Sequence, residues 1–179
     1  MLMMLALLAL IVAFAILCLL LFAASRPDDF SVSRTARIQA PPEKIFPLIN
    51  DLKAMNGWNP FVASVPEGAS TYSGPASGNG ATYAWDAKGR AGAGRFTVTG
   101  STPPSRVVMQ LDMLKPFEGH NQVTFTLAPA GGSTDVTWAM TGKHAFIPKV
   151  MGVVMSMDKM VGGSFEKGLA DLKTMAERS

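Results

Sequence analysis

The side chains best suited to acid–base or metal chemistry are few in this sequence and far apart. The two histidines, His120 and His144, show neither metal-ligand spacing nor a His-Glu-X-X-His pattern, so metal catalysis has no support. The sequence contains no Gly-X-Ser-X-Gly elbow, so a hydrolase triad has no support either. The single cysteine, Cys18, lies in a long apolar run, which excludes an internal disulfide and disfavours a reactive thiolate. We therefore expect no metal and no cofactor.

The remaining polar candidates fall on faces that can be predicted from alternation. His120 lies in the phase opposite to Val123, which predicts an outward-facing position. Asp112 and Arg95 fall on the polar phases of their strands and are expected to be solvated. Asp158 lies at the edge of an apolar helical stripe, where pairing with a cation at the sheet edge is favoured over contact with a ligand. No catalytic acid–base pair is predicted from these residues.

The elements that position these residues can be predicted in chain order. Residues 30–40 alternate between apolar and polar and predict a strand that ends at two prolines. Pro42 suits the first turn of a short helix, and a second short helix is expected over 51–56. Strands and turns are expected over 71–143. A long amphipathic helix is expected over 148–178.

Strict period-2 alternation in the later strands predicts an antiparallel meander with one buried face. That face contains Val107, Met109, Leu111 and Met113, then Val123, Phe125 and Leu127, then Val136, Trp138 and Met140. The apolar stripe of the long helix contains Val150, Val154, Met157, Val161, Phe165, Leu172 and Met175. A curved sheet with this helix across its concave face buries both apolar surfaces, which makes the fold class α+β.

Gly162, Gly163 and Gly168 lie in the interior of the long helix, and each costs about 1 kcal/mol relative to alanine there. Gly168 lies within the apolar stripe, where it would let the backbone approach the sheet closely. Gly162 and Gly163 lie on the flank and the far side, and close approach to the sheet does not explain them. We interpret this pair as a point of bending, with simple tolerance on a solvent face as the alternative.

No charged residue occurs from Leu2 to Ala24. As a helix this run would be ~34 Å long, enough to cross the ~30 Å hydrocarbon core of a bilayer. We favour an uncleaved single-pass anchor, because no basic residue precedes the run and the run is too long for a signal peptide. The sequence "FAAS" at its end keeps a cleaved signal peptide as the alternative. The predicted division is an anchor at 1–25, a linker at 26–30 and one domain at 31–179.

The net charge of +3 and pI of 9.2 come from basic residues spread along the chain without a Lys/Arg block. This distribution is poor support for nucleic-acid binding and is compatible with an anionic membrane surface. Arg26, Arg34, Arg37 and Lys44 follow the apolar run and no basic residue precedes it. The positive-inside rule then favours a cytoplasmic domain, but whole domains translocate regardless of charge, so the side stays open.

Three stretches resemble the SRPBCC (START/birch-pollen-allergen-like) superfamily, specifically its polyketide cyclase/dehydrase-like proteins. They are "RTARIQAPPEKIFPLINDLKAMNGWNPF", "VTWAMTG" and "MDKMVGGSFEKGLADLK", and the last resembles the C-terminal helix of membrane-anchored bacterial members. The resemblance covers about residues 30–178. It implies a helix-grip (START-like) fold, in which a seven-stranded antiparallel sheet grips the last helix around a hydrophobic cavity. It also implies the bacterial inner membrane as the location.

The predicted lining of that cavity combines residues of the sheet face and of the helix stripe. It consists of Trp85, Val98, Met109, Leu111, Met113, Phe125, Trp138, Met140, Val154, Met157, Val161 and Phe165. Methionine adapts to lipophilic ligands of varied shape, and aromatic walls suit flat ones. Ordinary core packing would use the same residues, so both interpretations remain open.

Because functions vary widely within one fold, the function must be argued from the site. We predict a membrane-anchored domain, attached through residues 2–24, that binds a lipid, isoprenoid or quinone-like molecule under its C-terminal helix. A polyketide cyclase or dehydratase using His120, His144 or Asp158 is an alternative. A second alternative is a non-catalytic interaction module for a membrane partner. The sequence names neither the ligand nor the oligomeric state.

Overall fold

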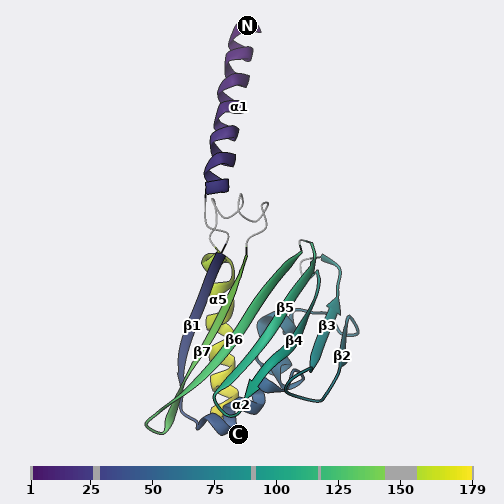
Figure 1. Cartoon of the computed structure of the whole chain (residues 1–179), viewed down its shortest axis with the longest axis vertical. Helices are drawn as coiled ribbons and strands as arrows, with labels where there is room; N and C mark the ends of the chain where they lie inside the picture. The colour runs from purple at the N-terminus through teal and green to yellow at the C-terminus, as the bar shows by residue number, and fades with distance from the viewer. Residues whose placement is uncertain (1, 26–28, 90–91, 117, 144–156, 179) are drawn as a thin grey trace.

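Seven antiparallel strands form one sheet with the order β1-β7-β6-β5-β4-β3-β2 (Figure 1). The strands are β1 (Asp29–Ile38), β2 (Ser70–Ser73), β3 (Thr82–Asp86), β4 (Ala93–Thr102), β5 (Arg106–Lys115), β6 (Gly119–Ala130) and β7 (Ser133–Lys143). From β2 to β7 each strand pairs with the next, and β1 pairs with β7, so β1 and β2 are the two edges. The predicted seven-stranded antiparallel sheet is confirmed.

The computed structural model describes residues 2–25, 29–89, 92–116, 118–143 and 157–178. Its helices are α1 (Leu2–Ser25), α2 (Pro42–Asn50), the 3₁₀ helix η1 (Ala54–Gly57), α3 (Pro60–Ala63) and α5 (Met157–Arg178). Helix α2 is the short helix predicted from Pro42. The second predicted helix, at 51–56, is instead the short η1, and α3 follows it without having been predicted.

Local capping explains the corner formed by η1 and α3. Asn59 is the N-cap of α3, and its Oδ1 accepts a hydrogen bond from the Phe61 N–H at 3.0 Å. Pro60 occupies the first helical position, where its missing N–H is harmless. Between the two short helices, the buried Trp58 donates from Nε1 to the Leu48 carbonyl at 2.8 Å. This bond fastens the corner to α2.

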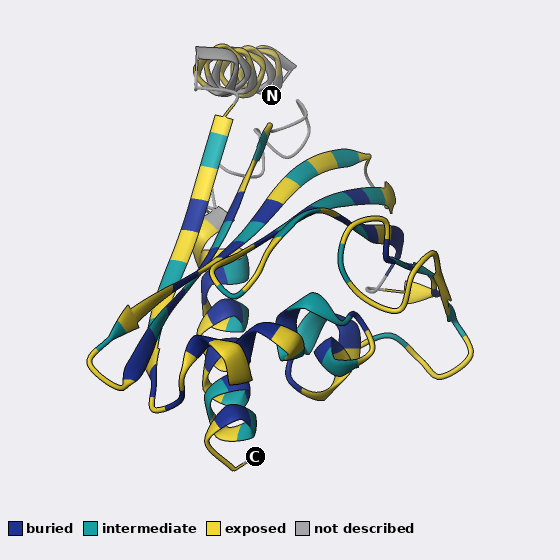
Figure 2. Cartoon of the chain, turned by 60° about the horizontal axis from the view of Figure 1, so that its bottom comes forward, coloured by how far each residue is buried: buried dark blue, intermediate teal, exposed yellow. Residues whose placement is uncertain are grey.

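Helix α5 lies along β1 and β7 and covers one face of the sheet, which we call the concave face (Figure 1). Its buried positions include Phe165, Leu169, Leu172 and Ala176, which follow helical spacing. Figure 2 shows the matching pattern on β1, where buried or half-buried positions alternate with exposed ones. The residues at 148–156, where the long helix was predicted to begin, lie outside the described residues.

The helix glycines have different structural reasons. A Cβ on Gly168 would lie 2.8 Å from the Trp138 ring and 3.0 Å from Pro60, so close approach to the sheet is confirmed at this position. A Cβ on Gly162 would collide with the Arg34 guanidinium. The neighbour of Gly162 is thus the end of a long side chain from β1, and among the described residues the three atoms nearest to that Cβ all belong to this side chain. Around Gly163, no described residue comes within 4 Å of the added Cβ.

Helix α1 stands apart from the sheet in Figure 1, with large apolar side chains such as Leu7, Leu10 and Phe14 exposed. Several of its side chains, those of Leu5 and Ala9 among them, lie outside the described residues. Counting only the described residues, no helix is both long enough and apolar enough to cross a membrane.

Candidate functional site

Strand register arranges the concave face into rows of cross-strand neighbours, and two central rows are tightly filled. We call them the packed rows. The first contains Arg34, Trp138, Phe125 and Val107, and the second Val32, Met140, Val123, Met109 and Val98. Except for Arg34, every side chain in these rows is buried. Helix α5 covers their β1 and β7 members, and α2 contacts the strands β5 and β6 that carry others.

Aromatic rings fill the space between the packed rows and the helices. Trp138 stacks on Phe165 of α5, with ring centroids 4.2 Å apart and planes 7° from parallel. Trp58 and Phe61, from the η1–α3 corner, meet Trp138 edge-on at 5.6 Å and 6.1 Å. Phe125 lies 5.0 Å from the same ring. Rings at these separations are in direct contact, so aromatic packing forms this part of the core.

Two further rows lie at the end of the concave face where β7 ends and β1 begins, and we call them the half-open rows. The first contains Phe30, Gly142, Asn121, Leu111, Phe96 and Tyr83, and the second contains Gly119, Met113, Gly94 and Trp85. Phe30, Leu111, Met113 and Trp85 are only half-buried, although their side chains are large and apolar. The exposure of the concave face therefore rises from the packed rows to the half-open rows.

Glycines contribute to this incomplete filling. The Trp85 ring lies over Gly94, whose Cβ would come within 2.7 Å of it, so Gly94 makes room for an aromatic wall. The Asn121 amide lies in the same way against Gly142. Among the described residues, a Cβ on Gly119 would meet only the Asn121 amide nitrogen, at 3.9 Å. The half-open rows thus combine an apolar wall, an amide and three glycines.

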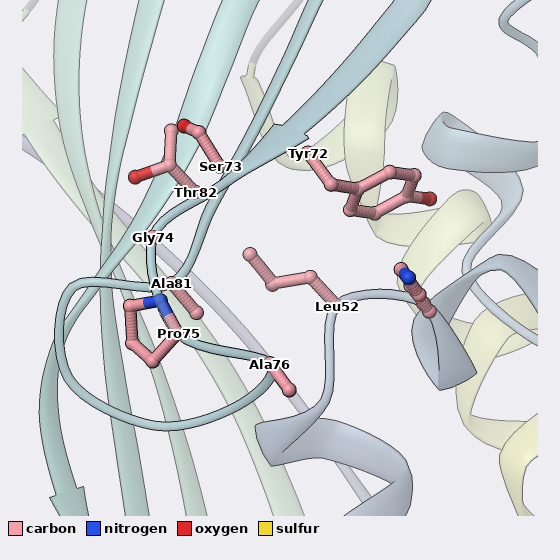
Figure 3. A pocket seen from close by; sticks show the side chains of 9 residues that line it. Leu52, Tyr72, Ser73, Gly74, Pro75, Ala76, Ala81 and Thr82 are labelled. Atoms are coloured by element: carbon pink, nitrogen blue, oxygen red, sulfur yellow. The ribbon is translucent and has the colours of Figure 1, made fainter.

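At the β2–β3 edge the concave face continues into a hollow of about 280 Å³. Its lining consists of Leu52, Lys53, Tyr72, Ser73, Gly74, Pro75, Ala76, Ala81 and Thr82. Figure 3 shows Leu52 reaching across from the turn after α2, with Tyr72 on β2 and Ala81 and Pro75 on the other side. The Tyr72 ring lies 5.0 Å from Tyr83, so an aromatic contact links the hollow to the half-open rows.

The opposite, outer face of the sheet carries a polar cluster. Asp112 Oδ1 lies 2.7 Å from His120 Nδ1, and its Oδ2 accepts from Arg95 Nε at 2.8 Å. The hydrogen bond from His120, aided by Arg95 and Gln110, holds the pKa of Asp112 below its ordinary value despite partial burial. His120 is exposed as predicted, but the prediction that Asp112 is solvated was wrong. Its cross-strand neighbours on β4 and β6 cover it.

Arg34 of β1 is the exception among the packed rows, because it faces α5 with a charge. Its guanidinium donates to Asp158 at 2.7 and 3.1 Å and to Glu166 at 2.7 Å. Asp158, Gly162 and Glu166 are spaced four residues apart, and the guanidinium lies over the glycine between the two acids. These hydrogen bonds lower the pKa of Asp158 and raise that of Arg34. The predicted pairing of Asp158 with a sheet-edge cation is confirmed.

The predicted cavity lining divides into three groups in the structure. Val98, Met109, Phe125, Trp138, Met140 and Phe165 are buried in the core. Trp85, Leu111, Met113 and Val161 are half-buried. Val154, the Met157 side chain and His144 lie outside the described residues. Ligand contact at these positions remains a prediction, and the half-buried group is the part of it with accessible surface.

The lining of the hollow was not predicted from the sequence. Leu52 and Lys53 come from the turn after α2, Tyr72 from β2, and Ala81 from the start of β3. The weak signal available was the short strand pattern around Tyr72 inside a Gly/Ser/Pro-rich stretch. Only the three-dimensional fold brings that strand beside the α2–η1 turn, through a hydrogen bond from Asn56 Nδ2 to the Tyr72 hydroxyl.

Comparison with known proteins gives a family and a fold. Residues 29–177 match the family described as "Polyketide cyclase / dehydrase and lipid transport". No curated protein matches the chain.

Among solved structures, a Chromobacterium violaceum protein is 18% identical with a TM-score of 0.55, covering 85% of this chain and 99% of its own. A Mesorhizobium loti protein is also 18% identical, with a TM-score of 0.58, covering 84% and 98%. The Aha1 dimer from Colwellia psychrerythraea is 19% identical, with a TM-score of 0.53, covering 83% and 94%. At these identities the similarity shows the fold alone.

Proposed function

Because the chain belongs to the polyketide cyclase/dehydrase and lipid transport family of the SRPBCC superfamily, we propose that it binds a hydrophobic small molecule on its half-open rows. One observation carries this proposal. Large apolar side chains are left half-exposed at one end of a concave face, whereas the apolar side chains of the packed rows are all buried. A ligand that covers this surface gains the free energy of removing it from water.

The types of side chain on the half-open rows support ligand binding in preference to catalysis. Within the described residues, the half-open rows present aromatic, aliphatic and methionine side chains, with the Asn121 amide and the Tyr83 hydroxyl as their polar groups. The Asp112–His120 pair, which has suitable groups for proton transfer, lies on the outer face of the sheet. A substrate on the concave face would be separated from it by the sheet itself.

The same proposal includes attachment to a membrane through α1. Its sequence from Leu2 to Ala24 is uncharged, and 24 helical residues reach about 36 Å, compared with a hydrocarbon core of ~30 Å. The basic residues that follow it favour the cytoplasmic face of a bacterial inner membrane. Phe30, in the first half-open row, comes five residues after Ser25, so at most about 18 Å of chain separates them. Such an anchor would hold the half-open rows close to the source of lipophilic ligands.

Native mass spectrometry of the full-length chain, extracted from its host membrane in mild detergent, tests this function. We expect an additional mass that survives removal of the detergent, is lost on denaturation and reports the ligand class. Leu111→Asp, which places a carboxylate in the half-open rows, is expected to abolish the additional mass. A mass that persists in this variant, or an apo mass that ignores added lipids, would refute binding at this site and favour an interaction module.

A further inference from the structure

The hollow at the β2–β3 edge differs in chemistry from the half-open rows to which it is linked. Its described lining contains one charged side chain, Lys53, together with the hydroxyls of Tyr72, Ser73 and Thr82. The Lys53 ammonium lies 5.7 Å from the centroid of the Tyr72 ring. No carboxylate pairs with Lys53 among the described residues. A cation at the rim of a small hollow attracts an anionic group.

Asp51, two residues before Lys53, uses its carboxylate to accept backbone hydrogen bonds. Asp51 Oδ1 accepts hydrogen bonds from the backbone N–H groups of Lys53 and Ala54, at 2.7 and 3.4 Å. The Asp51 side chain is therefore used to shape the turn after α2. The Lys53 backbone is fixed by this bond, while its ammonium is left at the hollow.

The size of the hollow limits what it can hold. Sites for whole drug-sized ligands measure about 300–1,000 Å³, and this hollow, at about 280 Å³, falls just below that range. It is suited to the head group of a longer molecule. The remainder of that molecule would continue along the aromatic contacts from Tyr72 to Tyr83 and from Tyr83 to Trp85. From β2 to the half-buried Leu111 on β5 is three strand spacings, or about 14 Å.

We propose that the ligand is an anionic single-chain amphiphile whose head group lies beside Lys53 and Tyr72 and whose chain extends to the half-open rows. This inference rests on the proposed function and narrows it to a ligand class. A carboxylate and a phosphate offer the same charge to Lys53, so a fatty acid and a phosphorylated long-chain alcohol are the two sources of this chemistry. The neutral alcohol with the same chain lacks the group that Lys53 recognises.

Photolabelling of the full-length chain in phosphatidylcholine nanodiscs separates these possibilities. Three diazirine probes share one C18 chain and carry a carboxylate, a phosphate or a hydroxyl. We expect Lys53→Gln to raise the half-saturating concentration of the anionic probes about fivefold, with the alcohol unchanged. Lys53→Arg should restore most of the affinity. The carboxylate and phosphate arms show which head group binds more tightly.

Lys88→Gln is the matched control, because Lys88 is an exposed lysine that lies six residues beyond Thr82, after the far end of β3. Equal losses in Lys88→Gln and Lys53→Gln would mean a general surface charge effect and would overturn the head-group site. Binding of all three probes with no effect of Lys53→Gln would overturn it too, while leaving the proposed function in place. A wild-type chain that binds none of the probes would overturn the proposed function itself.

Discussion

The packed rows and the half-open rows lie largely on the same strands, yet they differ in how far other side chains of the protein bury them. In the packed rows, Trp138 and Phe125 meet the rings of Phe165 and Trp58, so side chains of this chain fill the interior. In the half-open rows, Gly119, Gly94 and Gly142 lie among apolar side chains of which several, including Leu111 and Met113, are only half-buried. The difference shows that one alternating pattern can build both a packed core and a half-exposed apolar surface.

Helix α5 shows the same division along its length. From Phe165 to Ala176 it is held by buried apolar residues, including Leu169 and Leu172. From Asp158 to Gly163 its side chains are mostly exposed, and the described polar attachment is the ion pair with Arg34. The start of the helix is thus attached mainly through the Arg34 ion pair. The segment from Phe165 is attached mainly through packing, to which Glu166, Lys173 and Glu177 add polar contacts with β1 and the turn after it. Each prediction below tests this contrast.

Removing an aromatic ring from the packed rows should have the largest effect. Phe165→Ala would leave a cavity against Trp138 and is expected to lower the free energy of unfolding by about 3–5 kcal/mol. The matched change in the half-open rows, Leu111→Ala, removes a side chain that is only half-buried and should cost about 1–2 kcal/mol. Chemical denaturation of both variants measures the difference. Equal losses would show that the half-open rows are packed as a core.

Filling the half-open rows should separate stability from binding. Gly119→Val adds a side chain where, among the described residues, only the Asn121 amide comes within 4 Å, and valine suits a strand, so we expect little loss of stability. Occupying the ligand's space should raise the half-saturating lipid concentration on the order of tenfold. Gly94→Val is the control, because its Cβ would crowd Trp85 and overpacking costs about 1–3 kcal/mol. Unchanged lipid binding by Gly119→Val would place the ligand elsewhere.

Much of the fold could be predicted because alternation reports which face a strand residue occupies. Val123, Phe125 and Trp138 were predicted on one buried face, and the structure places them there. Alternation does not report register, and register decides which residues share a row. That Arg34 lies opposite Trp138, or Asp112 beside His120, depends on hairpin lengths that the pattern does not fix.

The division between core and candidate site could not be predicted from the sequence either, because alternation reports only which face a residue occupies. Met109 and Met113 have equal hydrophobicity and lie on the same face of β5, yet the first is fully buried and the second half-buried. Their exposure depends on how far α5 and the short helices extend over the sheet. The extent of this coverage is set by tertiary packing, and the alternation of residues within a single strand does not indicate it.

Substitutions at the two adjacent helix glycines, Gly162 and Gly163, should change stability less, and they test how α5 is attached to β1. Gly163→Ala meets no described residue within 4 Å and should raise stability by about 1 kcal/mol through helix propensity. Gly162→Ala gains the same propensity, but its Cβ would displace the Arg34 guanidinium from between Asp158 and Glu166. Its net gain in stability should therefore be smaller than that of Gly163→Ala. Equal gains in thermal unfolding would show that the Arg34 contacts contribute nothing.

The smallest expected effect is a local response of α5 to acid. Hydrogen bonds from Arg34 hold the pKa of Asp158 below its ordinary value. A carboxylate with a lowered folded-state pKa stabilises the fold above its unfolded pKa of about 3.9, and this contribution is lost as pH falls through the folded value. Hydrogen exchange near pH 3 should therefore rise first in the segment from Asp158 to Gly163, while the segment from Phe165 to Ala176 stays protected.

Two variants, Asp158→Asn and its control Asp171→Asn, show whether the acid response depends on the ion pair between Arg34 and Asp158. Asp158→Asn removes one of the two carboxylate partners of Arg34, so the segment from Asp158 to Gly163 should exchange faster at neutral pH and respond less to acid. Asp171→Asn breaks only the pair with Lys167 within the helix and should leave the first half unchanged. If acid instead loosened both halves of α5 together in the wild type, the helix would be a single cooperative unit. The contrast in stability between the segment attached through the Arg34 ion pair and the segment attached through packing would then be wrong, although the contacts seen in the structure would be unchanged.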